Sequence, residues 1–297
     1  MIRPLIRSLL YVPASSERFI ARAHTRGADA IILDLEDSVV AGEKIKARAR
    51  LAAAVAHVGQ AGARVFVRIN ATRDLIHGDA EAACEAGAFG ILVPKTRDPR
   101  VLFEMDALLG LLEHKSGREP MAVVPLIEDA AGVFEARAIA RGPRVLALNT
   151  GGLDLAASME AEPAADVLRL PILLVHLAAK AEGRLSLGTL APISDYSDAG
   201  GIRAAAVEAR AFGFDGAICI HPSAVEILNE AFGVAPTDLD WARRVVAGAK
   251  AAEAKGEGAF VVDGHMADAA TVVRARAIIT RWERAAGPEG RPPHATP

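Results

Sequence analysis

The sequence is poor in aromatic side chains and in cysteine, and it lacks long blocks of like charge. Aromatic residues make up 4% of the 297 residues, and 34 Lys and Arg against 37 Asp and Glu leave a net charge of −3. No nucleic-acid partner is expected, because such binding uses basic surfaces and stacking rings. The two cysteines, Cys84 and Cys219, lack metal-binding or redox spacing and are expected as small buried side chains in a helix and a strand.

Long apolar runs are missing as well. The longest stretch, residues 170–179, is interrupted by Pro171 and His176 and ends at Lys180, whereas a bilayer span needs about 20 apolar residues. The apolar patch before Pro13 is too short for a secretory signal. We therefore expect no membrane partner and a cytoplasmic location.

Several short motifs of common enzyme classes do not occur. No GxGxxG follows the first expected strand, and GxxxxGK[ST] is absent, which argues against dinucleotide and P-loop sites. HExxH, GxSxG and CxxC are absent too, so the sequence does not support a zinc protease, a serine hydrolase or a thioredoxin-like protein.

The chain does show a regular alternation of two kinds of segment. Short β-branched or Leu-rich runs alternate with alanine-rich segments of helical period, which is typical of α/β proteins. We expect one helix after each strand. The predicted strands are Ser8–Pro13, Ala30–Glu36, Arg64–Asn70, Gly90–Lys95, Met121–Glu128, Arg144–Leu148, Leu185–Leu190 and Gly216–His221.

Eight such units could form an open doubly wound sheet or a closed barrel. The barrel type averages ~250 residues, and the eighth unit ends near Phe232, so we predict a (β/α)8 TIM barrel over residues 1–232. Residues 233–297 are expected to form a C-terminal helical extension of the same domain. This extension would hold a helix from about Pro236 to Lys255, then a lid, then a disordered tail.

Polar residues cluster where the expected strands end. In a barrel the carboxyl ends of the strands meet at one mouth, where the active site forms. We therefore expect carboxylates and cations from several strands to converge there, from the set Asp34, Glu36, Asp37, Arg68, Asn70, Lys95, Glu128, Asp129, Asp154 and His221.

Glu128 and Asp154 are the candidates for a metal pair. Both follow neighbouring strands, and Mg²⁺ is usually bound by one or two protein carboxylates while it keeps positions open for substrate. The alternative for Glu128 is that it only caps the helix that follows it.

Arg68 lies in an apolar strand, where an unpaired guanidinium would be costly to bury. Either it pairs with Glu36, Asp37 or another carboxylate of the mouth, or it binds a substrate carboxylate through two hydrogen bonds. Lys95 could form a Schiff base, although a neighbouring metal site weakens the need for one. Glu36, Asp37 and Lys95 are expected in the substrate-binding region.

Cations follow the first two strands at helical spacing. Arg18 and Arg22 are four residues apart, as are Lys44 and Arg48. Such faces either bind phosphate groups or are simply solvated. His221 ends the eighth strand and is either a substrate-binding or a structural residue.

Six segments together resemble one known family, the citrate lyase β-subunit-like group of the HpcH/HpaI aldolases, which includes malyl-CoA and citramalyl-CoA lyases. The resemblance covers residues 7–285 and rests on RSLLYVP (7–13), ILDLEDSV (32–39), VRIN (67–70), LIEDAAG (126–132), FDGAICIHPS (214–223) and AFVVDGHMADAA (259–270).

The resemblance implies a TIM barrel with a C-terminal segment, assembled as a homotrimer or hexamer. It further implies Mg²⁺ at Glu128 and Asp154, a carboxylate-binding Arg68 and substrate contacts at Tyr11 and Arg18. A catalytic Asp268 would reach a neighbouring subunit's site. The chain departs from the family at residues 151–155, where an acidic residue before the second metal ligand is lost, and at 191–201, a loosely matching substrate loop.

These observations predict an Mg²⁺-dependent carbon–carbon lyase of a hydroxyacyl-CoA thioester such as citramalyl-CoA, malyl-CoA or citryl-CoA, or the reverse Claisen-type condensation. Arg68 would stabilise negative charge, Asp268 would exchange the proton, and Arg18 and Arg22 would bind CoA phosphates. The alternatives are an aldolase acting on a free 2-oxo acid and a citrate-lyase-like subunit active only with an acyl-carrier partner.

Overall fold

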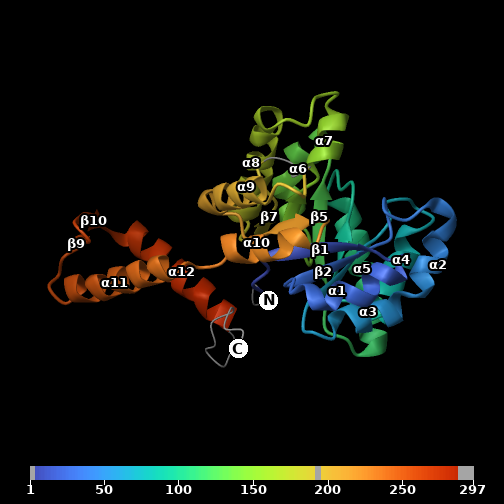
Figure 1. Cartoon of the computed structure of the whole chain (residues 1–297), viewed down its shortest axis with the longest axis horizontal. Coiled ribbons are helices and arrows are strands. Elements are labelled where there is room, and N and C mark those ends of the chain that lie inside the picture. Colours follow the sequence, from blue (N-terminus) through green and yellow to red (C-terminus); the bar gives the residue numbers. More distant parts are fainter. Residues whose placement is uncertain (1–3, 191–194, 287–297) are drawn as a thin grey trace. The chain divides into compact units, whose positions relative to one another are not determined.

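Eight parallel strands form a single ring in the computed structural model, which describes residues 4–190 and 195–286 (Figure 1). The order in the sheet is β7-β6-β5-β4-β3-β2-β1-β8. A parallel bridge between Leu187 and Gly216 joins the two ends. The predicted TIM barrel is therefore confirmed. The strands are β1 (Ser8–Pro13), β2 (Ala30–Asp34), β3 (Arg64–Arg68), β4 (Gly90–Val93), β5 (Ala122–Ile127), β6 (Ala147–Thr150), β7 (Leu185–Leu187) and β8 (Ala217–Cys219).

Closure of the ring depends on a glycine. The N–H of Gly188 donates to the carbonyl of Gly216 at 2.9 Å, and a Cβ at Gly216 would lie 2.1 Å from the carbonyl oxygen of Ile6. Because real Cβ atoms do not approach a backbone oxygen so closely, a larger residue at position 216 would push β1 and β8 apart.

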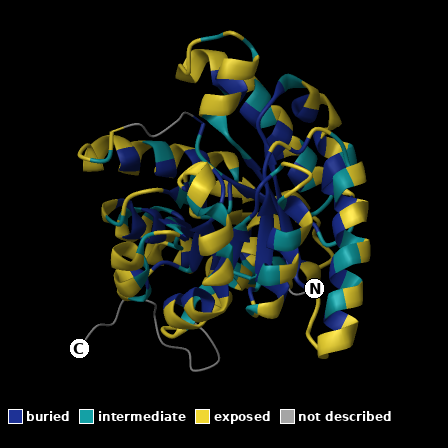
Figure 2. Ribbon diagram, turned by 90° about the vertical axis from the view of Figure 1, so that its right-hand side faces the viewer, coloured by how far each residue is buried: buried dark blue, intermediate teal, exposed yellow. Residues whose placement is uncertain are grey.

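Side chains alternate between two apolar layers along the strands. Leu9 and Ile32 belong to a cluster inside the barrel, whereas their neighbours Leu10 and Ile31 belong to the larger cluster between sheet and helices. Both faces of each strand are therefore buried, as Figure 2 shows for the sheet, which explains the nearly continuous apolar runs in the sequence.

The helices lie around this sheet, but the expected pattern of one helix per strand is wrong at two places. Two helices and a short 3-10 turn follow β2, and two helices follow β6. The helices of this part are α1 (Glu17–Ala23), α2 (Lys44–Ala49), α3 (Leu51–Gly59), α4 (Ile76–Glu85), α5 (Arg100–Ser116), α6 (Ala130–Ala140), α7 (Gly152–Ser158), α8 (Ala165–Ala181), α9 (Ala199–Phe212) and α10 (Ser223–Ala231), with 3-10 turns η1 (His24–Arg26) and η2 (Ala41–Glu43).

Several strands are shorter than predicted, for identifiable backbone reasons. Lys95 and Arg144 have left-handed backbones, with φ of 53° and 60°, so neither can continue a strand. Gly188, with φ of 127°, follows the last residue of β7. The polar residues after the strands consequently lie in loops, where their backbone groups are free to bind side chains.

The chain divides into two compact units, Ile6–Phe232 and a second unit formed by residues 1–5 and 233–297. In the second unit, α11 (Pro236–Glu253) packs against α12 (Ala269–Ala286), and an antiparallel hairpin of β9 (Phe260–Val262) and β10 (His265–Ala267) connects them. The hairpin turn consists of Asp263 and Gly264, both with positive φ, as a type I′ turn requires.

The second unit has its own small core, in which Ala242, Val245, Ala275 and Ile278 are buried. That the extension acts as a lid within one domain stays a prediction. The expected disordered tail, residues 287–297, and part of the expected substrate loop, residues 191–194, lie outside the described residues. No helix in the described part of the chain is long and apolar enough to cross a membrane.

Candidate active site

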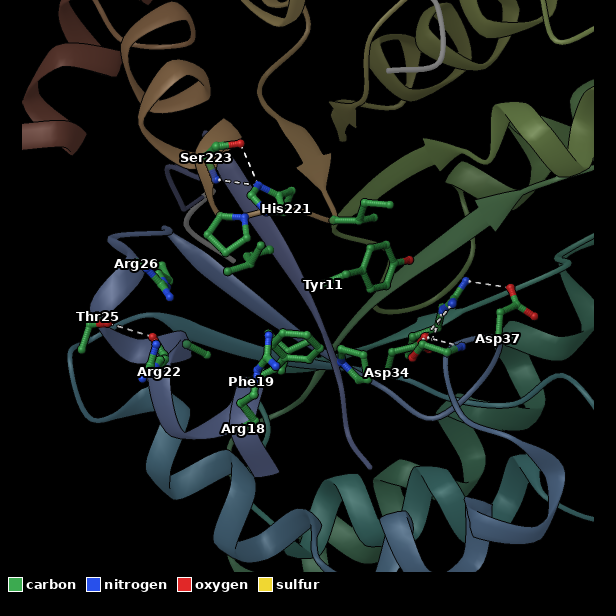
Figure 3. A pocket seen from close by; sticks show the side chains of 18 of the residues that line it. Tyr11, Arg18, Phe19, Arg22, Thr25, Arg26, Asp34, Asp37, His221 and Ser223 are labelled. Atoms are coloured by element: carbon green, nitrogen blue, oxygen red, sulfur yellow. Dashed lines mark hydrogen bonds and ion pairs between the residues drawn. The ribbon is translucent and has the colours of Figure 1, made fainter. Parts of the chain in front are cut away.

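A large cavity opens at the carboxyl ends of the barrel strands (Figure 3). Its volume is about 1230 Å³. Figure 3 shows Tyr11, Asp34 and Asp37 in one part of the cavity, and Arg22, Thr25 and Arg26 in another. Its polar lining comes from β1, α1, η1, α10 and the loops at the ends of β2, β3 and β8, and comprises Tyr11, Arg18, Arg22, Thr25, Arg26, Asp34, Asp37, Ser38, Arg68, His221, Ser223 and Glu226.

Arg68, the last residue of β3, is the centre of an ionic network. Its Nε and Nη2 donate to the two carboxylate oxygens of Asp34 at 2.7 and 2.8 Å. Its Nη1 lies 3.1 Å from Glu36 and 3.2 Å from Asp37. Burial opposes ionisation of Asp34, but the hydrogen bonds and charge of Arg68 hold the pKa of this carboxyl below its usual value.

The paired alternative for Arg68 is thus present in the structure, with Asp34 as the main partner. Asp34 was among the residues expected at the mouth, but sequence reasoning assigned it no role. The sequence feature that could have identified Asp34 is its position as the last residue of an apolar strand. In the structure it lies in direct register with Arg68 on the neighbouring strand. Binding of a substrate carboxylate by Arg68 stays a prediction.

Tyr11 lies against the other side of this network. The guanidinium carbon of Arg68 is 4.8 Å from the centre of the Tyr11 ring, a cation–π arrangement that helps to compensate a partly desolvated cation. Burial raises the pKa of the Tyr11 hydroxyl, so this group stays protonated and can donate a hydrogen bond.

Glu36 and Lys95 extend the network on the far side of Arg68. The Glu36 side chain is only 6% exposed, and its Oε1 lies 3.1 Å from Nζ of Lys95. Burial raises the pKa of Glu36 despite these two cations. Lys95 itself is half exposed, with 51% of its side chain accessible, so its ammonium remains open to a ligand while it pairs with Glu36.

Glu128 follows β5 and is buried. Its Oε2 accepts a hydrogen bond from the backbone N–H of Lys95 at 2.7 Å. Lys95 has a left-handed backbone conformation at this point. Burial raises the pKa of Glu128 to about 7, and the negative charges of Glu36 and Asp154 act in the same direction. Helix α6 is capped instead by Asp129, whose Oδ1 accepts the N–H of Gly132 at 2.7 Å.

Asp154 lies in the first turn of α7 and is exposed. The loop before it approaches Glu128 closely, because a Cβ at Gly151 would lie 2.6 Å from Cγ of Glu128. The negative charge of Asp154 contributes to the raised pKa of Glu128, and a cation bound between the two carboxylates would relieve this repulsion. In the described ranges no three or more His, Cys, Asp or Glu residues form a metal cluster. Carboxylate oxygens such as those of Glu128 and Asp154 are the donors that a hard cation prefers.

Three arginines line the cavity beside α1 and η1. Arg18 and Arg22 were expected there, whereas Arg26 was missed because it follows the helix in the 3-10 turn. His221 also lines the cavity, and its Nδ1 lies 2.7 Å from Oγ of Ser223. Its role as a substrate-binding residue stays a prediction.

Lys44 and Arg48, considered as phosphate-binding cations, have partners within the chain instead. Nζ of Lys44 donates to the carbonyls of Leu35 and Glu36 at 3.1 and 2.7 Å, and also to Oδ1 of Asn70. Arg48 pairs with buried Asp79 at 2.6 Å, and Asp79 accepts two hydrogen bonds from Asn70. This network ties the loop that carries Glu36 to the end of β3.

Asp268 belongs to the C-terminal unit, and it precedes α12. Its Oδ1 accepts from the N–H and the hydroxyl of Thr271, both at 3.0 Å. These hydrogen bonds lower the pKa of its exposed carboxyl. The expected approach of Asp268 to a neighbouring subunit's cavity stays a prediction.

Comparison with known proteins gives a consistent result. Residues 7–222 match the model of the HpcH/HpaI aldolase/citrate lyase family. A protein from Cereibacter sphaeroides named (3S)-malyl-CoA thioesterase is 34% identical over 93% of this chain and 94% of its own length. An L-malyl-CoA/beta-methylmalyl-CoA lyase from the same species is 30% identical, with the same shares covered.

A solved structure resembles most of the chain. Protein CitE from Mycobacterium tuberculosis, in complex with magnesium, acetoacetate and coenzyme A, aligns with a TM-score of 0.75 and 31% sequence identity. The alignment covers 94% of this chain and 99% of the CitE chain.

Proposed function

The chain belongs to the HpcH/HpaI aldolase/citrate lyase family, and from that premise we propose that it is a magnesium-dependent carbon–carbon lyase of a hydroxyacyl-CoA thioester. Malyl-CoA, citramalyl-CoA and citryl-CoA are the candidate substrates. The observation that carries the proposal is one cavity of about 1230 Å³ that joins the Arg68 network to a group of three arginines. Such a cavity accommodates a small acid and a long phosphorylated carrier together.

The acid portion would lie near Glu128 and Arg68. Glu128 and Asp154 would hold Mg²⁺, which supplies Lewis-acid polarisation of the acid's oxygens when bound. Their oxygen-only donor set, and the raised pKa that a nearby cation would reverse, fit this ion. Magnesium complexes of CitE, a similar protein, support the same choice.

Cleavage breaks the bond between the hydroxyl-bearing carbon and the α-carbon of the thioester. The hydroxyl loses a proton, and the electron pair of the broken bond forms an enolate of acetyl-CoA, which then takes up a proton. Arg68 would stabilise the negative charge of the acid or enolate, an effect often worth ~3 to 4 kcal/mol. The protonated Tyr11 hydroxyl and the Lys95 ammonium border the same network and would orient the acid.

The CoA portion would extend toward Arg18, Arg22 and Arg26. Guanidinium groups bind phosphate oxygens through paired hydrogen bonds, which suits a pyrophosphate or a ribose phosphate. The CoA complex of the similar CitE protein supports this use of the cavity. A carrier-bound acyl group, as in a citrate-lyase-like subunit, and a free 2-oxo acid are the alternative substrates.

Asp268 would exchange the proton at the α-carbon. We propose that it does so in a neighbouring subunit of a homotrimer or hexamer. Its exposed, ionised carboxylate would accept the α-proton in the condensation direction and, once protonated, would return that proton to the enolate in the cleavage direction. General acid–base catalysis of this kind contributes ~10² to 10⁴-fold. The proposal includes a cytoplasmic location.

A second candidate is hydrolysis of the same thioester. It is favoured by the 34% identity to a protein named (3S)-malyl-CoA thioesterase. The two reactions have different products, because a lyase yields acetyl-CoA and a 2-oxo acid whereas a thioesterase yields free CoA and an intact hydroxy acid.

The test is to incubate the purified chain with each of the three esters, with Mg²⁺ and with EDTA. Expected products are acetyl-CoA with glyoxylate, pyruvate or oxaloacetate, measured by chromatography, without release of free thiol. Release of free CoA as the initial product would show that the chain acts as a thioesterase and not as a lyase. No reaction with any ester, together with cleavage of a free acid or of an acyl-carrier ester, would favour the corresponding alternative.

A further inference from the structure

Asn149 differs from two other buried asparagines in how its side-chain amide is used. Asn70, Asn149 and Asn229 are only 3%, 8% and 7% exposed. Nδ2 of Asn70 donates to Asp79 at 2.7 Å, and Nδ2 of Asn229 donates to the carbonyl of Gly27 at 2.9 Å. The amide of Asn149 has no hydrogen-bond partner among the residues that the structure describes. It is therefore available to a ligand.

The side chain of Asn149, the third residue of β6, points into the barrel. Asn149 is in register with Leu126 of β5 and with Leu187 of β7, and both leucines belong to the apolar cluster inside the barrel. Residues in register on neighbouring parallel strands face the same side of the sheet. The amide consequently lies in the interior layer, between two leucines.

This layer is the one directly beneath the carboxylates of the mouth. Glu128 follows Leu126 by two residues, and Gly151 follows Asn149 by two. A Cβ at Gly151 would lie 2.6 Å from Cγ of Glu128. On the other side, a Cβ at Gly188, the first residue after β7, would lie 3.6 Å from Oδ1 of Asn149. The amide thus forms part of the floor of the mouth, below Glu128.

An amide at this place has an energetic cost that a ligand would offset. Burial of an amide without hydrogen bonds destabilises a fold, and a leucine, which has the same branching, would fill the layer without this cost. An unpaired buried group of this kind calls for an explanation in function. The amide carries two donors and an acceptor, and the oxygens of a small acid near Glu128 would lie directly above it.

We propose that Asn149 is a substrate-binding residue, whose Nδ2 donates a hydrogen bond to an oxygen of the small acid at Glu128 and Asp154. The ligand class is a 2-oxo acid or the corresponding 2-hydroxy acid portion of the ester. The inference rests on the proposed function for the nature of this acid. It holds for either fate of the thioester, carbon–carbon cleavage or hydrolysis.

The test combines acid binding with stability in full-length Asn149→Leu protein. Calorimetric titration with glyoxylate, pyruvate and oxaloacetate in the presence of Mg²⁺ should show affinities at least ~10-fold below those of the parent, because a hydrogen bond to a charged ligand is lost. Mg²⁺ affinity without acid should stay within about twofold. In urea without ligands the variant should be no less stable than the parent, since it removes an unpaired buried amide.

Two alanine variants make the comparison independent of how leucine fits the layer. Asn149→Ala should also weaken acid binding by at least ~10-fold. Asn229→Ala is the matched control: it removes an amide with partners inside the chain, so it should lower the urea midpoint and leave acid affinity unchanged.

Three outcomes would overturn the assignment. The first is unchanged acid affinity in both Asn149 variants. The second is a loss of Mg²⁺ affinity as large as the loss of acid affinity, which would place the amide at the metal. In both cases the proposed function would stand. The third is a parental protein that binds none of the three acids, and this result would overturn the proposed function as well.

Discussion

The charged residues of the barrel mouth and those of the C-terminal unit differ in how they are held. Arg68 contacts three carboxylates and an aromatic ring, and its side chain is 11% exposed. Asp268 is exposed, and its carboxylate accepts hydrogen bonds from Thr271 in the first turn of α12. Burial makes the charges of the mouth interdependent, whereas the carboxylate of Asp268 depends on contacts within a few residues of its own position.

This difference separates two ways of contributing to activity. The charged side chains at the barrel mouth are held in fixed positions, and their charges act in a partly desolvated environment. Asp268 has the ordinary carboxylate chemistry of an exposed residue and requires a partner site to become useful. Substitutions in the two regions should therefore affect stability and turnover in different proportions.

The largest effect is expected for Glu128→Gln. Removal of this carboxylate should lower turnover by at least ~10³-fold, because metal-ion polarisation supplies several kcal/mol. The Mg²⁺-induced rise in melting temperature should disappear as well. Glu208→Gln, at an exposed surface ion pair, should change neither quantity. If the Glu128→Gln enzyme still requires Mg²⁺ for turnover, Glu128 is not a ligand of the metal.

Asp268→Asn should lower kcat by ~10² to 10⁴-fold, while the free energy of unfolding and the Mg²⁺-induced shift stay within about 0.5 kcal/mol of the parent. The comparison is Asp263→Asn in the neighbouring turn, which should keep its activity. Mixed Asp268→Asn and Glu128→Gln subunits should regain part of the activity after exchange. Absence of any regain would contradict delivery of Asp268 between subunits.

Arg68→Met should lower both the activity and the stability of the protein. It should lower kcat/KM by ~10² to 10³-fold and the free energy of unfolding by about 3 to 5 kcal/mol, because it leaves Asp34 buried without its counter-charge. Adding Asp34→Asn should recover most of the stability in urea titrations but not the activity. Full recovery of activity in the double variant would mean that Arg68 has only a structural role.

The pH dependence of the metal-free protein should identify Glu128. Its pKa is raised from 4.5 to about 7 in the folded state, so between these values the native protein binds a proton that the unfolded chain has lost. The free energy of unfolding should therefore fall as pH rises from 4.5 to about 7, by roughly 3 kcal/mol at most. Urea titrations in EDTA at pH 5.5 and 8 measure the part of this fall above pH 5.5, which is about 2 kcal/mol.

Two further measurements test whether Glu128 causes this pH dependence. Glu128→Gln should abolish most of this fall, since it has no proton to lose. In the parental protein, Mg²⁺ affinity should rise as pH increases toward about 7, because the metal competes with the proton for Glu128. Metal affinity independent of pH between 6 and 8 would contradict the assignment.

The smallest effect is expected for Lys44→Met, which removes three hydrogen bonds at the loop carrying Glu36. We expect kcat/KM to fall by about tenfold, chiefly through positioning of the Arg68 network. Lys46→Met, at an exposed lysine of the same helix, is the control. Equal behaviour of the two variants in kinetics and melting would show that the Lys44 contacts do not position the site.

Much of the architecture followed from local patterns. The eight strands, the helix from Pro236 and the grouping of polar residues after the strands were predicted because apolar periodicity and strand ends are written in neighbouring residues. The extra helices after β2 and β6 were missed, since a long connection can fold into one helix or two with little difference in composition. The Asp263–Gly264 hairpin was likewise read only as part of a lid.

Local patterns and motifs in the sequence were enough to predict the barrel, the family and the residue types available at its mouth. The partners of these residues became known only from the folded chain: Asp34 accepts from Nε and Nη2 of Arg68, the Lys95 backbone donates to Glu128, and Lys44 donates to Leu35, Glu36 and Asn70. The physical reason is that pairing and burial depend on residues from strands far apart in sequence. The pKa of a carboxyl such as Glu128 changes only when those strands close around it.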